Sequence, residues 1–83
     1  MKIHFYGHAA FMLLGSRRIL IDPFLSGNPL CPITEDALPA ADAVVVSHDH
    51  PDHLGDAFAI CREHGAILYS LHEIAVMAGQ LGI

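Results

Sequence analysis

The chain has 83 residues, of which 53% are hydrophobic, with a mean hydropathy of +0.44 and a formal net charge of -5 at pH 7. This length allows one small domain, and so apolar a composition predicts that part of its surface faces another polypeptide. The strong cations form no basic stripe, which argues against a nucleic-acid-binding surface; they are Lys2, Arg17, Arg18 and Arg62.

The first part of the chain predicts an antiparallel meander. Residues 2–6, KIHFY, alternate between apolar and polar side chains, as in a half-buried strand. The apolar runs AAFMLL and RRILI are separated by Gly15-Ser16, a two-residue hairpin signal. We expect the meander to end at Asp22-Pro23.

A long loop and a β-α-β-α segment follow. Residues 23–41 contain four prolines and cannot form one regular element, so we expect a loop there. A short buried strand is predicted from Ala43 to Ser47, and another at AILYS. Helices are predicted from two sets of apolar residues at helical spacing, the first ended by Gly65: Leu54, Ala57, Phe58 and Cys61, then Leu71, Ile74, Ala75 and Ala78. The order of elements predicts an α/β layered fold.

Composition also suggests a compartment. Cys31 and Cys61 lie far apart and form no C-x-x-C pair, which favours free thiols over a disulfide or a cysteine zinc site. The N-terminal apolar stretch is broken by His4, Gly7 and His8, unlike a signal peptide, and no segment has the length of a membrane span. We therefore expect a soluble cytoplasmic protein without nucleic-acid or membrane partners.

The stretch SHDHPDHLGD, residues 47–56, concentrates metal-binding side chains directly after the apolar run AVVV. His48, His50 and Asp52 are spaced by two, so an extended segment projects them to one side, and Pro51 keeps His50 extended. His53 comes where the next helix is expected to begin. Imidazole and carboxylate ligands suit zinc, iron or manganese. The alternative is a solvated acidic loop, which the position between a strand and a helix disfavours.

These residues resemble a known family. H-x-H-x-D-H after an apolar strand is similar to the signature of the metallo-β-lactamase superfamily. G-H-A-A-F, I-L-I-D-P-F-L-S-G-N-P and V-V-V-S-H-D-H-P-D-H-L-G-D resemble a branch of metal-dependent hydrolases of mostly unassigned substrate, akin to ascorbate-phosphate lactonases. The resemblance implies that residues 1–83 are a single partial domain: the N-terminal half of an αββα sandwich, with one mostly antiparallel or mixed sheet and two helices.

The resemblance also implies a dinuclear metal site. His48 and His50 would bind the first cation, and Asp52 and His53 the second. Two divalent cations, zinc first and manganese or iron as alternatives, would share a hydroxide that attacks a small ester, lactone or phosphate-containing substrate. Asp52 would also act catalytically by orienting that water. The remaining ligands are expected beyond residue 83, so the isolated chain is not expected to complete catalysis. A missing C-terminal half, a partner chain or a second copy would cover the bare sheet.

Two further residues are candidates for supporting roles. In the family that the chain resembles, an aspartate at the position of Asp22 supports the metal cluster by hydrogen bonding; a turn residue before Pro23 is the alternative. His8 is predicted to border the mouth of the site, or else to be a structural histidine at a strand turn. Structural roles are predicted for the other histidines and for both thiols; these histidines are His4, His64 and His72. Asp49 is expected to support the ligands by hydrogen bonding or to face solvent, and not to bind the metal.

Three functions remain open from the sequence. The first is a metal-dependent hydrolase, or half of one. The second is the nuclease branch of the same superfamily, which the acidic charge balance disfavours. The third is a half-domain without catalytic activity that binds a partner through its exposed sheet.

Overall fold

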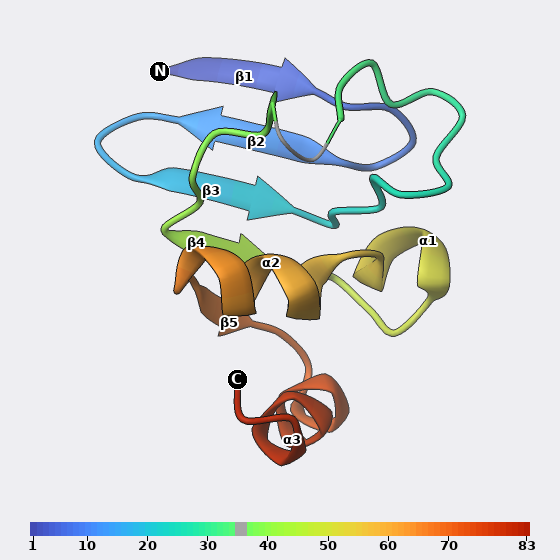
Figure 1. Ribbon diagram of the computed structural model, residues 1–83, viewed down its shortest axis with the longest axis vertical. Coiled ribbons are helices and arrows are strands. Elements are labelled where there is room, and N and C mark those ends of the chain that lie inside the picture. Colours follow the sequence, from blue (N-terminus) through green and yellow to red (C-terminus); the bar gives the residue numbers. More distant parts are fainter. Residues whose placement is uncertain (35–36) are drawn as a thin grey trace.

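The structure is a computed structural model that describes residues 1–34 and 37–83; residues 35 and 36 of the predicted loop lie outside the described residues. Five strands form one sheet in the order β1-β2-β3-β4-β5 (Figure 1). Strands β1 (Lys2–Phe5), β2 (Phe11–Leu14) and β3 (Arg18–Ile21) are antiparallel neighbours, which confirms the predicted meander. The turn between β2 and β3 is one residue longer than predicted, because Gly15 N–H donates to the carbonyl of Arg17 at 3.1 Å.

The second half of the sheet is parallel. Strand β4 (Ala43–Val45) pairs with β3, and β5 (Ile67–Tyr69) pairs with β4, both in parallel. Helix α2 (Ala57–His64) connects β4 to β5 and ends at Gly65, which has the left-handed conformation (φ 66°) expected of a C-terminal glycine. Helix α3 (His72–Gln80) follows β5. Strands β1, β3, β4 and β5 therefore run in one direction, and their carboxyl ends lie along one edge of the sheet.

A short helix, α1 (Pro51–Leu54), changes one detail of the prediction. His50 is extended (φ -122°, ψ 143°), as the following proline requires. The helix begins at Pro51, a residue well suited to the first helical position, so Asp52 lies in its first turn and not on an extended strand. Gly55 (φ 46°) then separates α1 from α2, where one continuous helix had been predicted.

One face of the sheet carries the core. Met12, Leu20 and Val44 are fully buried at the centre of this face. Helix α2 covers it with Ala57, Ile60 and Cys61, α3 adds Ile74, and the 23–41 loop adds Leu25, Leu38 and Ala41. Figure 1 shows α2 passing in front of β4. Apolar loop residues thus substitute for a helix over the antiparallel strands. In α3, Ile74 and Ala78 are buried as predicted, whereas Ala75 is exposed.

The opposite face of the sheet is apolar, and no helix or loop of residues 1–34 and 37–83 covers it. The strand register places its side chains in two rows that run across all five strands: Ile3, Leu13, Ile19, Ala43 and Ile67, and Phe5, Phe11, Ile21, Val45 and Tyr69. At the edge strands the exposure is large, 63% for Ile3 and 60% for Ile67. We call these ten residues the open face. None of the described helices is long and apolar enough to span a membrane.

Candidate metal centre

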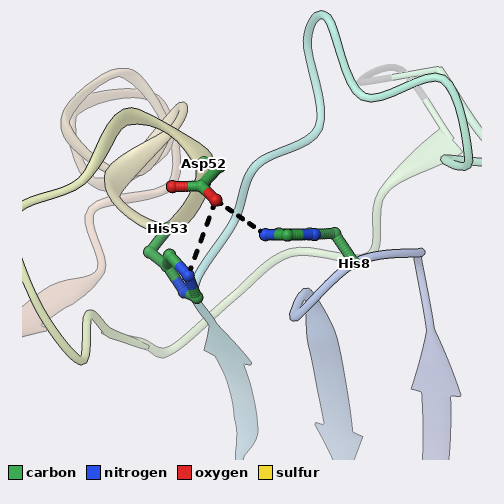
Figure 2. A group of neighbouring side chains, drawn as sticks. All are labelled: His8, Asp52 and His53. Atoms are coloured by element: carbon green, nitrogen blue, oxygen red, sulfur yellow. Dashed lines mark hydrogen bonds and ion pairs between the residues drawn. The ribbon is translucent and has the colours of Figure 1, made fainter.

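The candidate site lies where three strands that run in the same direction end. His8 follows β1, Asp22 follows β3, and Ser47 and His48 follow β4. Helix α1 brings Asp52 and His53 to the same place (Figure 2). In sheets with parallel strands, ligands characteristically bind outside these carboxyl ends, because side chains from neighbouring strands converge there.

Asp22 is the buried hydrogen-bond acceptor at the base of the site, with 5% of its surface exposed. Its carboxylate accepts hydrogen bonds from the Ser47 backbone N–H (2.7 Å), the Ser47 hydroxyl (2.7 Å) and His53 Nδ1 (2.9 Å). Burial by itself raises the pKa of Asp22, but these hydrogen bonds and the charge of His53 outweigh burial and leave the pKa lowered. Asp22 is therefore ionised at neutral pH and fixes the proton of His53 on Nδ1.

Ser47 extends the influence of Asp22 to a second ring. Its hydroxyl donates to Asp22, so it can accept a hydrogen bond from His48 Nδ1, which lies 2.7 Å away. With both Nδ1 atoms engaged, the Nε2 atoms of His48 and His53 are the ones left to bind a cation. The two ring centroids are 4.0 Å apart, and the His50 ring centroid lies 4.6 Å from that of His48. The three motif histidines thus form one cluster.

His8 and Asp52 meet across 44 positions of sequence. His8 Nε2 lies 2.8 Å from Asp52 Oδ2, and His53 Nε2 lies 3.8 Å from the same oxygen (Figure 2). Slight desolvation raises the pKa of Asp52, but hydrogen bonds from His8 and from a backbone amide, with the charges of His53 and His8, lower the pKa overall. The carboxylate is thus an acceptor, and His8 donates to it from Nε2.

The donor set fits a divalent cation. Among residues 1–34 and 37–83, His8, Asp52 and His53 form a group whose ligand atoms all lie within 4.8 Å of one another. Neutral imidazole nitrogens and an ionised carboxylate oxygen are ligands that zinc, manganese and iron accept. This group contains two of the four ligands predicted from sequence. The rings of the other two, His48 and His50, lie beside His53 or beside each other.

The remaining candidates lie outside the cluster. Asp49 is exposed, as are His4 and His72. His64 Nδ1 accepts the backbone N–H of Ala41 at 3.0 Å, a structural contact. Cys61 is buried, and burial raises the pKa of its thiol; the Cys31 thiol donates to the carbonyl of Ile33 at 3.4 Å.

Two residues of this region were not predicted from sequence. Ser47 was read only as the end of a strand, although its position directly before the motif was a usable signal. Asn28 lies in the loop predicted at residues 23–41, where no role was predicted for it. It is 7% exposed, and its side-chain amide donates to the carbonyls of Phe24 (2.9 Å), Gly7 (3.2 Å) and Tyr6 (3.4 Å). Asn28 therefore ties the 23–34 segment to the turn that carries His8.

Comparison with known proteins identifies the family of the chain. Residues 17–80 match the family described as the Beta-lactamase superfamily domain. A UPF0173 metal-dependent hydrolase of Pelotomaculum thermopropionicum is 51% identical over 75 residues, which are 90% of this chain and 32% of that protein. A UPF0173 metal-dependent hydrolase of Korarchaeum cryptofilum is 45% identical over 83 residues, 99% of this chain and 37% of the relative.

A solved structure supports the fold. Igni18, a metallo hydrolase from the hyperthermophilic archaeon Ignicoccus hospitalis, superimposes with a TM-score of 0.89 at 39% identity, covering 98% of this chain and 36% of the other. The chain spans about a third of the length of these relatives, less than the half predicted from sequence. By its match over residues 17–80, its motif and its fold, the chain belongs to the metallo-β-lactamase superfamily.

Proposed function

We propose that this chain is the metal-binding part of a hydrolase that acts on a small ester, lactone or phosphate-containing substrate. The observation that carries the proposal is the cluster at the carboxyl edge of the sheet, in which Asp22 and Ser47 hold the rings of His53 and His48 with Nε2 free. The similarity to proteins named metal-dependent hydrolases supports the same chemistry.

The four residues of the H-x-H-x-D-H motif are the proposed ligands of two divalent cations. His48 and His50 would hold one, and Asp52 and His53 the other. Zinc suits this mixed nitrogen and oxygen set, and manganese or iron are alternatives. Bound there, such cations would lower the pKa of water toward neutrality and polarise the scissile bond. Asp52, which is ionised and half exposed, is the proposed residue for orienting the attacking water.

The positions of the supporting residues follow from their contacts. Asp22 is proposed to orient the ring of His53, because the buried Asp22 carboxylate accepts a hydrogen bond from His53 Nδ1. His8 borders the cluster from the turn after β1. Its side chain is 43% exposed, so a substrate could reach it.

The open face supports a role for further polypeptide. A continuous layer of ten apolar side chains on one face of a sheet is normally covered in a folded domain. We propose that additional chain, a partner or a second copy covers it, and that the covering polypeptide supplies the ligands that a two-cation site still needs. The free thiols Cys31 and Cys61 support a reducing compartment such as the cytoplasm.

Metal analysis tests this assignment. The chain is stripped by dialysis against a chelator, reloaded with Zn²⁺ or Mn²⁺, and its bound metal is measured. We expect replacement of His48 and His50 by alanine to reduce the metal content, and replacement of His4 and His72, both exposed and outside the cluster, to leave it unchanged. Equal metal content in the two double variants would contradict the ligand assignment.

A chimera extends the test to catalysis. The 83 residues replace the matching segment of the Korarchaeum cryptofilum relative, and the product is assayed on panels of small esters, lactones and phosphate esters. We expect hydrolysis that a chelator abolishes and that the His48→Ala, His50→Ala chimera lacks. Salt-sensitive cleavage of RNA by the chimera, without hydrolysis of small substrates, would favour a nuclease instead.

A further inference from the structure

The turn between β1 and β2 places a third potential ligand beside Asp52 and His53. A catalytic zinc ion is commonly held by three protein ligands at about 2.0–2.2 Å, which places ligand atoms roughly 3.3 Å from each other. The distances from Asp52 Oδ2 to Nε2 of His8 (2.8 Å) and of His53 (3.8 Å) lie on either side of this value. All three ligand atoms lie within 4.8 Å of one another, so no pair has to approach by more than about 1.5 Å to reach this separation.

His8 is held at this place by an unusual backbone. Its φ is 58°, a left-handed conformation that residues other than glycine seldom adopt, and the preceding Gly7 has φ 95°. Gly7 has no room for a side chain, since a Cβ would lie 2.6 Å from the Cβ of Leu30. The side-chain amide of Asn28 holds the turn in place by donating hydrogen bonds to the carbonyls of Tyr6 and Gly7. Non-glycine residues in such conformations concentrate at functional sites.

The contact with Asp52 alone does not account for this conformation. Both side chains are close to half exposed, 43% for His8 and 45% for Asp52. Ion pairs at such exposure stabilise proteins little, because water and salt screen them. Without a cation, the His8–Asp52 pair therefore stabilises the fold too little to offset the strain of the left-handed backbone at His8.

The partner ring is already prepared for a cation. His53 Nδ1–H donates a hydrogen bond to Asp22, which leaves His53 Nε2 with a free lone pair on the side of Asp52. An arrangement of carboxylate, histidine and metal in this order orients the ring and strengthens the ligand.

We propose that His8, Asp52 and His53 together hold one divalent cation within this chain, so that His8 is a ligand and not only a neighbour of the site. Binding displaces the hydrogen bond from His8 Nε2 to Asp52: the Nε2 proton leaves to water, the cation takes the freed Nε2 lone pair, and the neutral ring takes up a proton from water on Nδ1. The inference rests on the proposed metal-dependent function and adds a ligand to it from outside the H-x-H-x-D-H motif.

Zinc titration of the 83-residue chain tests the proposal. The chain is stripped with a chelator and titrated with Zn²⁺ in competition with a chromophoric chelator, as wild type, His8→Ala and His72→Ala. Removing one of three ligands is expected to weaken the tightest site by about 100-fold or more, whereas His72→Ala, an exposed histidine on α3, is expected to match the wild type. An unchanged affinity in folded His8→Ala would overturn the proposal.

Imidazole NMR provides a readout that needs no substitution. In the metal-free chain, His8 Nε2 is expected to carry the proton donated to Asp52. At saturating Zn²⁺ this nitrogen is expected to lose the proton and to shift in ¹⁵N as a coordinated nitrogen does. If the rings of His48, His50 and His53 respond while His8 Nε2 stays protonated, the proposal fails and the proposed function stands. If no histidine responds and no zinc binds, both fail.

Discussion

At the scale of single residues, Asp22 has the most connections in the site. One buried carboxylate receives three hydrogen bonds and so fixes the orientation of two rings, those of His53 directly and His48 through Ser47. The positive φ of Asp22 (44°) shows that the backbone bends sharply where β3 ends, which turns this side chain toward Ser47 at the end of β4. The electrostatics of the site therefore depend on a residue that is not expected to touch the cation.

The lowered pKa of Asp22 predicts that the chain loses folding stability in acid. Its pKa is lowered in the folded chain, so its contribution to stability is complete above the unfolded value of about 3.9 and is lost as the pH falls through the folded pKa. Asp22→Asn is expected to cost about 1–3 kcal/mol near pH 6, because the hydrogen bonds to an ionised, buried group are lost. The difference in free energy of unfolding between the variant and the wild type should narrow below about pH 4.

Urea unfolding of the metal-free wild type and Asp22→Asn between pH 3 and pH 6 measures this gap. The exposed Asp49→Asn serves as the control and is expected to follow the wild type at every pH. A gap that stays constant down to pH 3 would show that the charge of Asp22 contributes nothing to folding.

At the scale of elements, contacts between the loop after β3 and the start of α2 support the candidate metal centre. Asp56 N–H donates to the carbonyl of Pro23 at 2.9 Å, and the Asp56 carboxylate accepts the backbone N–H of Ser26 at 2.8 Å. Gly55 allows this approach, since a Cβ there would lie 2.5 Å from Phe24 Cα and would also contact the carbonyl oxygen of Pro23. The break between α1 and α2 is therefore required by packing.

Gly55→Ala and Gly79→Ala form a matched pair that tests this packing. Gly55→Ala is expected to destabilise the chain by about 2–4 kcal/mol, because the methyl group overlaps backbone and φ is positive. Gly79 lies in α3 with open space around it, so Gly79→Ala is expected to stabilise by up to about 1 kcal/mol. Thermal unfolding followed by circular dichroism distinguishes them. Equal melting temperatures for the two variants would show that the approach of Phe24 to Gly55 is not needed.

How far the sequence predicts these elements depends on the range of the interactions. Local patterns predicted the meander and the end of α2 at Gly65, because alternation and a left-handed glycine act within a few residues. They missed the split at Gly55, which depends on a loop some thirty positions earlier in the chain.

The same limit applies to the site. The four motif residues were predicted because they lie within six consecutive positions, 48 to 53. The contact of His8 with Asp52 could not be derived, because it depends on the order of strands in the sheet and on the buried Asn28 that fixes the β1–β2 turn. Spacing in sequence predicts which groups are close only when one short segment of the chain carries all of them.

At the scale of the whole molecule, the uneven distribution of apolar surface is the main feature. The core lies on one side of the sheet, while the open face exposes Phe5, Ile67 and Tyr69 by more than half of their surface. A shallow hollow of about 440 Å³ lies on this face, lined by Ile19, Val45 and Ile67 among others. Exposed apolar surface of this extent favours association with another polypeptide.

The open face predicts self-association of the isolated chain. We expect its sedimentation coefficient to rise with concentration, and we expect the substitutions Phe5→Lys and Ile67→Lys to suppress the rise, because a charge there opposes burial. Val76→Lys places the same charge at an exposed position of α3 and is the control. A wild-type chain that stays monomeric at high concentration would contradict this prediction.

Anomalous X-ray diffraction from crystals soaked in Zn²⁺ shows whether the side chains at the carboxyl edge of the sheet converge on divalent cations. We predict an anomalous peak within about 2.2 Å of Nε2 of His53 and of a carboxylate oxygen of Asp52, with a second peak beside His48 and His50. Zinc that appears only elsewhere on the surface, with these four side chains free of it, would show that this cluster is not a metal site.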